Sequence, residues 1–358
     1  MKHPAWHNIH PYFELNGASF NFEDLTEMGY SLVKEGEDFE VPLGEFLLDW
    51  ISNKPFLEVF TSGSTGAPKK IVLQKEQMIN SALATGEYFK LRPKQTALLC
   101  LPCSGIAGKM MVVRAMVLGM HLDYVEPSST PLDHCERPYD FVAMVPMQVQ
   151  NSLEKLSPFI KTLIIGGAPV DALLMDRLKS VSTHVFETYG MTETITHIAV
   201  KEIAPKSSLF FKTLPHVEIA VDDRGCLVID APKISEGKII TNDLVELTGK
   251  DQFRWLGRYD SIINSGGIKL FPEKIEEQLS SIMESRFFVA GIPDGTLGQK
   301  LILVVEGETT SKKTLLEKIK RLKNISKYEV PKAIYFVKHF DETPSKKIDR
   351  KKTMQQIS

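Results

Sequence analysis

The sequence predicts an α/β protein. A large N-terminal domain, with a parallel sheet flanked by helices plus a small β region, precedes a small α+β C-terminal domain. Three short apolar runs, at residues 97–101, 141–145 and 162–165, are bounded by Pro, Gly or Asp, and each precedes a helix-like stretch. Continuous apolar strands that alternate with helices are typical of a parallel sheet covered on both faces.

The elements that follow support the same fold class. A helix is predicted from near Met147 through residues 153–156, and residues 170–178 carry apolar side chains at helical spacing. Two further strand-like runs, residues 217–221 and 226–229, flank the sequence Asp-Asp-Arg-Gly. This arrangement predicts a β-hairpin and therefore a small antiparallel region.

The last hundred residues alternate between strand and helix patterns. A helix with proline and acidic residues in its first turn is predicted at residues 271–279. The other predicted elements are strands at residues 287–291, 301–305 and 333–337 and an amphipathic helix at residues 312–322. We place the boundary so that the two domains comprise residues 1–259 and 260–358.

The charge of the chain excludes a generally basic nucleic-acid-binding protein, which needs a cationic excess. The 358 residues include 43 Lys and Arg against 45 Asp and Glu, a formal net charge of −2. Residues 261–358 contain 18 basic against 12 acidic residues, a net charge of +6, so residues 1–260 carry −8. This basic part could meet an anionic ligand, although a solvated, lysine-rich surface also explains it.

The chain shows no sign of membrane insertion or of a disulfide scaffold. No apolar run approaches the ~18 residues of a membrane-spanning helix, so no membrane insertion is expected. Four cysteines form no disulfide scaffold and favour a reducing, cytoplasmic setting. Cys100 and Cys103 have the spacing of a redox or zinc half-site, but Cys135 and Cys226 are solitary. We interpret Cys100 and Cys103 as small buried residues.

A phosphate-binding loop is predicted after the strand-like run at residues 56–60. The loop consists of Thr61, Ser62, Gly63, Ser64, Thr65, Gly66, Ala67, Pro68 and Lys69. Glycines let backbone N–H groups close on phosphate oxygens, and the hydroxyls and the lysine add donors and charge. It is not a Walker loop, because a proline and not a glycine precedes the lysine. A flexible surface turn is the alternative interpretation.

This loop resembles the phosphate-binding loop of the adenylate-forming enzymes, which include acyl-CoA synthetases, peptide-synthetase adenylation domains and luciferases. A second match is formed by residues 166–169 and 187–194. The resemblance implies that Tyr189 packs on adenine, that Thr192 holds the α-phosphate and that Glu193 binds Mg²⁺. An aromatic face suits a purine, and a carboxylate is a hard ligand that suits Mg²⁺.

A third match comprises residues 241–244 and 257–267, with Asn242 where the family usually has Gly. The resemblance implies that Asp243 and Arg258 hold the ribose and that Asp260 is the hinge of a mobile C-terminal domain. It assigns Ser265, Gly266 and Gly267 to the CoA tunnel. The complete expected ATP and AMP site is Thr61, Ser62, Gly63, Ser64, Thr65, Gly66, Lys69, Gly167, Ala168, Glu187, Tyr189, Gly190, Asp243 and Arg258.

A fourth match, residues 343–351, maps the catalytic lysine of the family to Lys347, and Lys346 stands where Gly is usual. Together the motifs imply catalysis by Lys347, Thr192 and Glu193 with ATP, Mg²⁺ and CoA and a small-molecule carboxylic acid as substrate. The carboxylate would attack ATP to give an acyl-adenylate, and a thiol would then displace AMP. Most family members carry a much larger N-terminal subdomain before the phosphate loop, whereas only sixty residues precede it here. Either this chain belongs to a compact subgroup or part of the scaffold is supplied otherwise, for example by a homodimer that covers the exposed face.

Residues 101–114 match the start of the acyl-pocket helix of the family, with Gly105 where His is common. The resemblance assigns Ser104, Gly105, Lys109, Arg114 and Gly166 to the acyl pocket. Arg114 lies on an otherwise apolar helix, so its guanidinium needs either an internal acid or a second carboxylate on the substrate.

The stretch at residues 101–114 is most similar to o-succinylbenzoate–CoA ligases of menaquinone synthesis, whose substrate is an aromatic dicarboxylic acid. We therefore expect that activity. One alternative is an enzyme that adenylates another aryl or acyl acid and passes the acyl group to CoA or a carrier protein. A third hypothesis is a regulator that binds adenylate without catalysis, but the complete set of motif residues disfavours it.

Replacing Lys347 separates the two predicted half-reactions. We expect Lys347→Ala to reduce acyl-adenylate formation strongly, because its cation offsets the repulsion between carboxylate and phosphate. Thioester formation from preformed acyl-adenylate should be retained. Pyrophosphate release and single-turnover thioester formation measure the two steps, and an equal loss in both would contradict the assignment.

Overall fold

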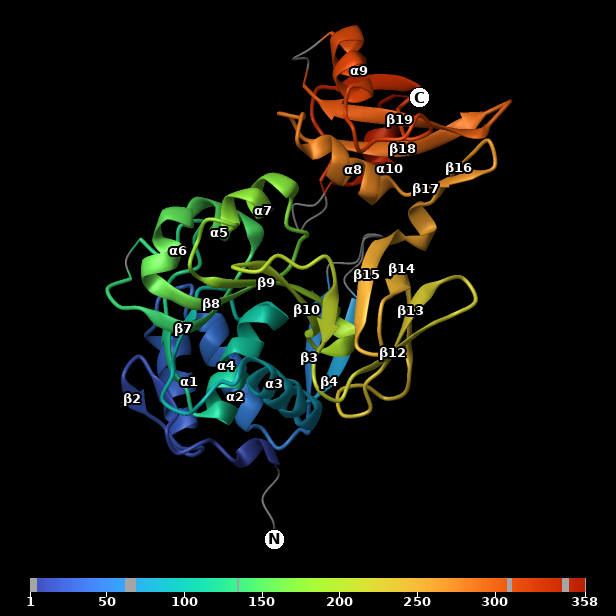
Figure 1. Cartoon of the computed structure of the whole chain (residues 1–358). Helices are drawn as coiled ribbons and strands as arrows, with labels where there is room; N and C mark the ends of the chain where they lie inside the picture. The colour runs from blue at the N-terminus through green and yellow to red at the C-terminus, as the bar shows by residue number, and fades with distance from the viewer. Residues whose placement is uncertain (1–4, 62–68, 134, 308–310, 343–347, 358) are drawn as a thin grey trace.

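The computed structural model describes residues 5–61, 69–133, 135–307, 311–342 and 348–357. Its main feature is a sheet of 13 strands, in the order β12-β13-β14-β15-β11-β10-β9-β8-β7-β5-β6-β1-β2. Parallel strands form one half of this sheet and antiparallel strands form the other (Figure 1). The predicted antiparallel region is therefore continuous with the parallel sheet.

The parallel half follows the predicted alternation of strands and helices. Five of its strands follow one another along the chain: β5 (Thr96–Leu99), β6 (His121–Tyr124), β7 (Tyr139–Met144), β8 (Ile160–Ile165) and β9 (His184–Gly190). The N-terminal strand β1 (Glu14–Leu15) adds to β6 in parallel. The helix predicted near Met147 is two helices, because the chain breaks at Ser152 between α5 (Pro146–Asn151) and α6 (Leu153–Phe159).

Buried side chains alternate between the two faces of this half. Leu99, Phe141 and Ile164 belong to the core that includes residues of α3 (Lys75–Phe89) and α4 (Ile106–Leu118). Leu98 and Val142 belong to a second core, shared with α5, α6 and α7 (Ala172–Leu178). The two helical layers lie on opposite sides of the sheet (Figure 1). Successive side chains of a strand point to opposite faces of the sheet, and helices cover both faces. These strands are therefore apolar at consecutive positions.

The antiparallel half begins with β10, which pairs along β9 from Gly190 to Val185. Its strands are β10 (His197–Ala204), β11 (Phe211–Thr213), β12 (Glu218–Val221), β13 (Cys226–Asp230), β14 (Ile239–Leu247) and β15 (Gln252–Arg258). The predicted hairpin is β12 and β13, which pair directly around Asp222 and Gly225. Asp243 pairs with Arg258 across β14 and β15, so two residues of the third motif become neighbours.

The N-terminal residues form small elements at the edge of the body. These are η1 (Ala5–His7), β1 (Glu14–Leu15), β2 (Ala18–Ser19), α1 (Asp24–Lys34), α2 (Val41–Ile51) and the hairpin of β3 (Phe56–Thr61) with β4 (Lys69–Gln74). Helices α1 and α2 pack against each other and bury Leu25, Leu47 and Trp50 in the main core.

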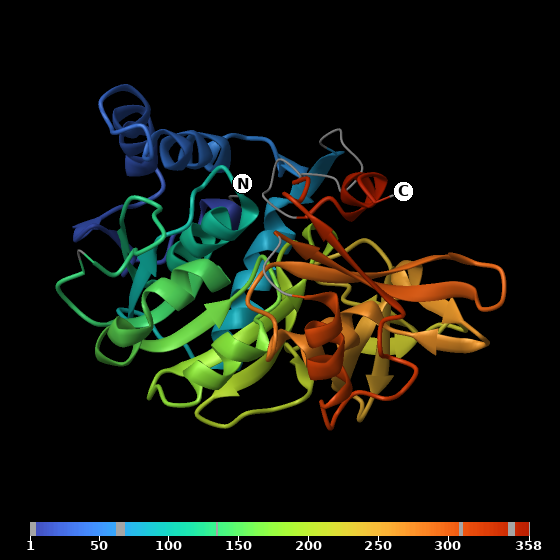
Figure 2. The ribbon, with the colours of Figure 1, turned by 90° about the horizontal axis from the view of Figure 1, so that it is seen from above.

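The C-terminal elements form a sheet and cores of their own above the 13-stranded body (Figures 1 and 2). They are η3 (Tyr259–Ser261), β16 (Ile263–Ser265), β17 (Ile268–Leu270), α8 (Pro272–Ser280), β18 (Phe287–Asp294), β19 (Gly298–Glu306), α9 (Lys312–Lys320), β20 (Ala333–Val337) and α10 (Arg350–Gln355). In the described parts of the chain, no helix is both long and apolar enough to span a bilayer.

Candidate active site

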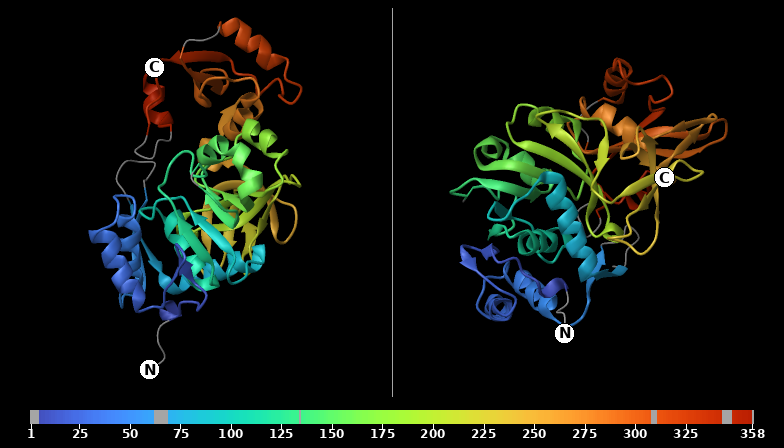
Figure 3. Two further views of the ribbon diagram at one scale, coloured as in Figure 1. Left: turned by 90° about the vertical axis from the view of Figure 1, so that its left-hand side faces the viewer. Right: turned by 60° about the horizontal axis from the view of Figure 1, so that its bottom comes forward.

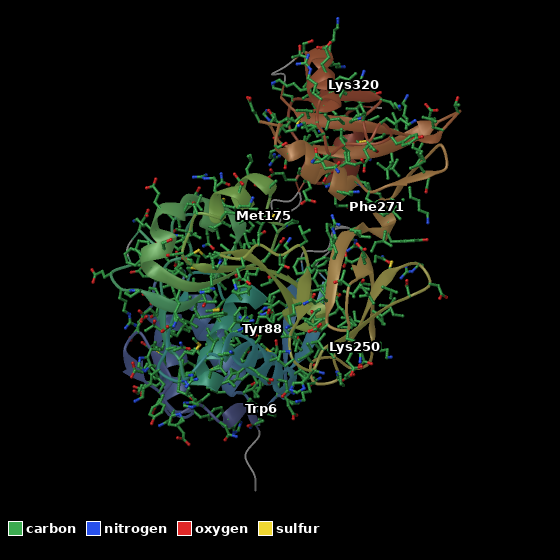
Figure 4. The ribbon with its side chains drawn as sticks, viewed as in Figure 1. Trp6, Tyr88, Met175, Lys250, Phe271 and Lys320 are labelled. Carbon is green, nitrogen blue, oxygen red and sulfur yellow. The ribbon has the colours of Figure 1, made fainter. Side chains whose placement is uncertain are left out.

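The candidate site begins at the carboxyl ends of β8 and β9, where ligands bind in open α/β sheets. The loop at residues 166–171 follows β8, and the short helix η2 (Thr192–Thr194) follows β9. Helix α7, which comes directly after this loop, contacts α8 of the C-terminal part. Met175 of α7 and Phe271 before α8 mark the two sides of this junction in Figure 4. The motif loops therefore lie where body and C-terminal part meet.

Tyr189 and Asp243 are joined although they come from different motifs. The Tyr189 hydroxyl donates a hydrogen bond of 2.7 Å to Asp243 Oδ2, and Trp255 Nε1 donates one of 3.2 Å to Oδ1. The Tyr189 ring stands edge-on to Phe211 and Phe253, with ring centroids 5.8 and 5.2 Å away. Burial and the Asp243 charge raise the pKa of Tyr189, so its hydroxyl remains a donor. This network fixes an aromatic ring beside a carboxylate.

Arg258 lies between Asp243 and the predicted hinge residue Asp260. Its Nε and terminal nitrogen donate hydrogen bonds of 3.2 and 3.3 Å to the two Asp260 oxygens, and Nε lies 3.9 Å from Asp243 Oδ1. The hydrogen bonds to Asp260 are the main cause that raises the pKa of Arg258. The side chain assigned to the ribose thus pairs with the start of the C-terminal part.

Glu193 projects from η2 as an exposed carboxylate next to Thr192. The Thr194 hydroxyl fixes this turn, because it accepts from Met191 N at 3.0 Å and donates to Thr196 O at 2.7 Å. Across the described ranges, no cluster of three or more His, Cys, Asp or Glu could hold a metal. A single carboxylate fits Mg²⁺, which usually binds to one or two carboxylates together with substrate phosphates.

Glu187 has internal partners instead. Its Oε2 lies 2.6 Å from Lys201 Nζ, and its Oε1 accepts a hydrogen bond of 3.2 Å from Val170 N. The carboxylate therefore holds the loop that contains Gly167 and Ala168, two other predicted nucleotide contacts. Gly167 has φ of +82°, a conformation that favours glycine. The carboxylate of Glu187 is therefore already engaged by partners within the protein.

Several predicted residues lie outside the described residues: Ser62, Gly63, Ser64, Thr65 and Gly66 of the phosphate loop, and Lys347. The backbones of Thr61 and Lys69 pair at the end of the β3–β4 hairpin, so the loop is the connection of a hairpin. Gly266 and Gly267 form the turn between β16 and β17, with φ of +58° and +81°.

The predicted acyl-pocket residues occupy different parts of α4 and its surroundings. Ser104 and Gly105 are exposed before the helix, and Lys109 Nζ lies 5.0 Å from the centroid of the Phe46 ring. Gly166 lies near Thr188, whose Oγ1 would be 2.8 Å from a Cβ at this position. Arg114 is about 14 Å farther along the helix axis than Gly105, given a rise of ~1.5 Å per residue.

Arg114 is 2% exposed and has only uncharged partners in the structure. Its Nε lies 3.4 Å from Thr85 Oγ1, and one terminal nitrogen lies 3.3 Å from Thr196 Oγ1 and 3.4 Å from His197 Nδ1. Burial lowers the pKa of Arg114 to about 10, which leaves it charged at neutral pH. Over the described ranges, no Asp or Glu pairs with it, so the internal acid considered from the sequence is not found there.

The family model for AMP-binding enzymes matches residues 49–241, more than half of the chain. The chain belongs to the AMP-binding enzyme family. This confirms the family and the fold class that the motifs and apolar runs predicted.

Similar members of the AMP-binding family include 2-succinylbenzoate–CoA ligases. The protein of Listeria monocytogenes serovar 1/2a is 25% identical over 94% of this chain and 77% of its own length. A 2-succinylbenzoate–CoA ligase of Bacillus cereus is 24% identical with the same coverage.

Two solved structures of this family are also similar. An acyl-CoA synthetase (AMP-forming)/AMP-acid ligase II-like protein from Dyadobacter fermentans is 36% identical, with 93% and 98% of the two chains covered and a TM-score of 0.61. O-succinylbenzoate coenzyme A synthetase from Bacillus subtilis, in complex with ATP and magnesium, is 20% identical, with 83% and 69% covered and a TM-score of 0.73.

The sequence did not identify the side chains that contact the predicted site residues. Trp255 holds Asp243, and Thr85, Thr196 and His197 surround Arg114. Trp255 carries a sequence signal, because it lies three residues before Arg258 in the strand that pairs with β14. Thr85 carries none, since its contact with Arg114 depends on how α3 packs on α4.

Asp243→Asn tests the ribose assignment in this AMP-binding enzyme. We expect KM for ATP to rise by about 10- to 100-fold, because hydrogen bonds to a charged acceptor are stronger than neutral ones. Tyr189→Phe is the matched control: it retains the ring and removes one donor to Asp243, so its effect should be smaller. An unchanged KM for ATP in a folded Asp243→Asn variant would refute the assignment.

Proposed function

We propose that this chain is an ATP-dependent acid–CoA ligase that converts o-succinylbenzoate into its CoA thioester through an acyl-adenylate. The substrate assignment depends on one observation, the buried guanidinium of Arg114 with only neutral neighbours. A buried cation of this kind favours an anionic ligand, and a dicarboxylic acid supplies one carboxylate for Arg114 and one for reaction. The similar 2-succinylbenzoate–CoA ligases support the same substrate.

The nucleotide-binding residues perform the first step mainly by positioning and charge. Asp243, held by Tyr189 and Trp255, accepts hydrogen bonds from the ribose hydroxyls, and the Tyr189 ring offers an aromatic face to adenine. Thr192 would hold the α-phosphate. Glu193 would hold Mg²⁺, which offsets the negative charge of the phosphates. An oxygen of the substrate carboxylate attacks the α-phosphorus, and pyrophosphate leaves.

The second step requires no new nucleophile from the protein. The CoA sulfur attacks the acyl carbonyl, the bond to AMP breaks, and the thiol proton is released. We propose that residues 260–358 swivel about Asp260 between the steps, so that Lys347 serves the first and the Ser265–Gly266–Gly267 turn serves the second. The Arg258–Asp260 pair gives this motion a defined starting contact.

A substrate panel is the first experiment. Pyrophosphate release is measured with MgATP and o-succinylbenzoate, benzoate or a fatty acid, each with and without CoA. We expect turnover with o-succinylbenzoate that requires CoA, and Arg114→Gln should raise KM for this acid much more than KM for ATP. Release with another acid alone would retain adenylation and reject the substrate, and no release with any acid would favour a non-catalytic adenylate-binding protein.

We also propose that the protein works in the cytoplasm as a homodimer. Its four cysteines are free thiols, which suits a reducing compartment. Residues 23–49, around α1 and α2, contain nine acidic residues and one lysine, whereas residues 312–338, around α9, contain nine basic and two acidic residues. These stretches lie at opposite ends of the molecule (Figure 3). In an antiparallel dimer with two-fold symmetry, the acidic stretch of each protomer would face the basic stretch of its partner, so this contact would be made twice.

Salt tests this dimer. We expect a dimer at about 50 mM salt that dissociates near 0.5 M, because exposed charges are screened over a shorter distance there. Lys318→Glu with Lys320→Glu should give a monomer at low salt, whereas the control Lys206→Glu with Lys250→Glu should not. Sedimentation velocity measures the state, and a monomer at every salt concentration would contradict the dimer.

A further inference from the structure

We propose that His197 is a positioning residue for Arg114. The neutral ring, protonated at Nε2, accepts a hydrogen bond from the guanidinium at Nδ1 and fixes the direction of its remaining donors. The inference deepens the proposed function and rests on it, because it explains how Arg114 is held ready for the second carboxylate of a dicarboxylic substrate.

The contact between the two side chains determines the ring tautomer. One terminal nitrogen of Arg114 lies 3.4 Å from His197 Nδ1. Arginine has donors and no acceptor, so Nδ1 must be the unprotonated nitrogen and the proton must lie on Nε2. Burial and the nearby Arg114 charge hold the pKa of His197 well below its usual range, which agrees with a neutral ring.

The opposite side of the ring supplies an independent observation. His197 is 5% exposed and Ser81 is 1% exposed, and neither His197 Nε2 nor Ser81 Oγ has a hydrogen-bond partner among the described residues. Both residues line one cavity of about 10 Å³, between α3, β10 and residues 214–217 and 233–234. This volume accommodates about one water. A water bonded to both atoms would accept a hydrogen bond from Nε2–H and secure the tautomer.

The neutrality of His197 has a consequence for substrate choice. Thr85, Thr196 and His197 orient the guanidinium through hydrogen bonds without neutralising it. The full positive charge therefore remains for the carboxylate of the substrate. An acidic residue in place of His197 would pair with Arg114 internally and compete with that carboxylate.

Three substitutions distinguish positioning from packing. His197→Asn keeps a neutral acceptor near the Nδ1 position, so KM for o-succinylbenzoate should stay within about 3-fold of wild type. His197→Leu keeps the volume without the acceptor and should raise this KM by about 10-fold, the cost of a hydrogen bond to a charged group. His197→Asp should raise it by about 100-fold while its melting temperature is not lowered, because the new carboxylate pairs with Arg114. KM for ATP should change less than 3-fold in all three.

A spectroscopic measurement keeps the proposal separate from the activity. The ¹⁵N shifts of the His197 ring, assigned by comparison with His197→Asn, should show a proton on Nε2 at neutral pH. A proton on Nδ1, or equal KM values for the acid in the Leu, Asn and Asp variants, would overturn the proposal. Failure of wild type to turn over any dicarboxylic acid would instead overturn the proposed function, and the ring tautomer would still be readable.

Discussion

The close approach of β9 and β10 at Gly190 is the constraint on which both halves of the site depend. A Cβ at Gly190 would lie 2.3 Å from Thr196 O and 2.5 Å from His197 Cα, so only glycine permits this contact. The approach lets β10 begin directly beside the end of β9 and changes the sheet from parallel to antiparallel. On one side of this point lie Tyr189 and Glu193, and on the other lie Thr196 and His197, which contact Arg114. One backbone contact thus links the nucleotide site and the acid site that we propose.

The fold could be predicted largely because its strands carry local signals. Leu98, Leu99, Phe141 and Val142 are apolar in succession since helices cover both faces of the sheet, and this pattern is visible without any long-range contact. The continuity of the antiparallel strands with the parallel ones was not visible. It depends on β11 lying between β10 and β15, a pairing of segments about forty residues apart that no local pattern encodes.

The site could be predicted only as far as its residues lie in motifs. Tyr189, Asp243 and Arg258 were identified from the sequence, and the structure places them together. Their internal partners were not identified, because the Glu187–Lys201 pair and the Trp255–Asp243 hydrogen bond arise from strand register. Register is set by all the side chains that a sheet buries, so a single motif does not specify it.

The polar surroundings of Arg114 show why a buried cation can be useful without a counter-ion in the protein. An internal carboxylate would offset the desolvation cost of the guanidinium and would also occupy the donors that a substrate needs. Hydroxyl and imidazole acceptors satisfy part of the hydrogen-bonding capacity and leave the net charge in place. The uncompensated charge is then relieved only when an anion binds. In the function that we propose, a dicarboxylic acid gains a favourable contact at Arg114 that a monocarboxylic acid of similar shape cannot make, and selectivity follows from an energetic cost that the free protein carries.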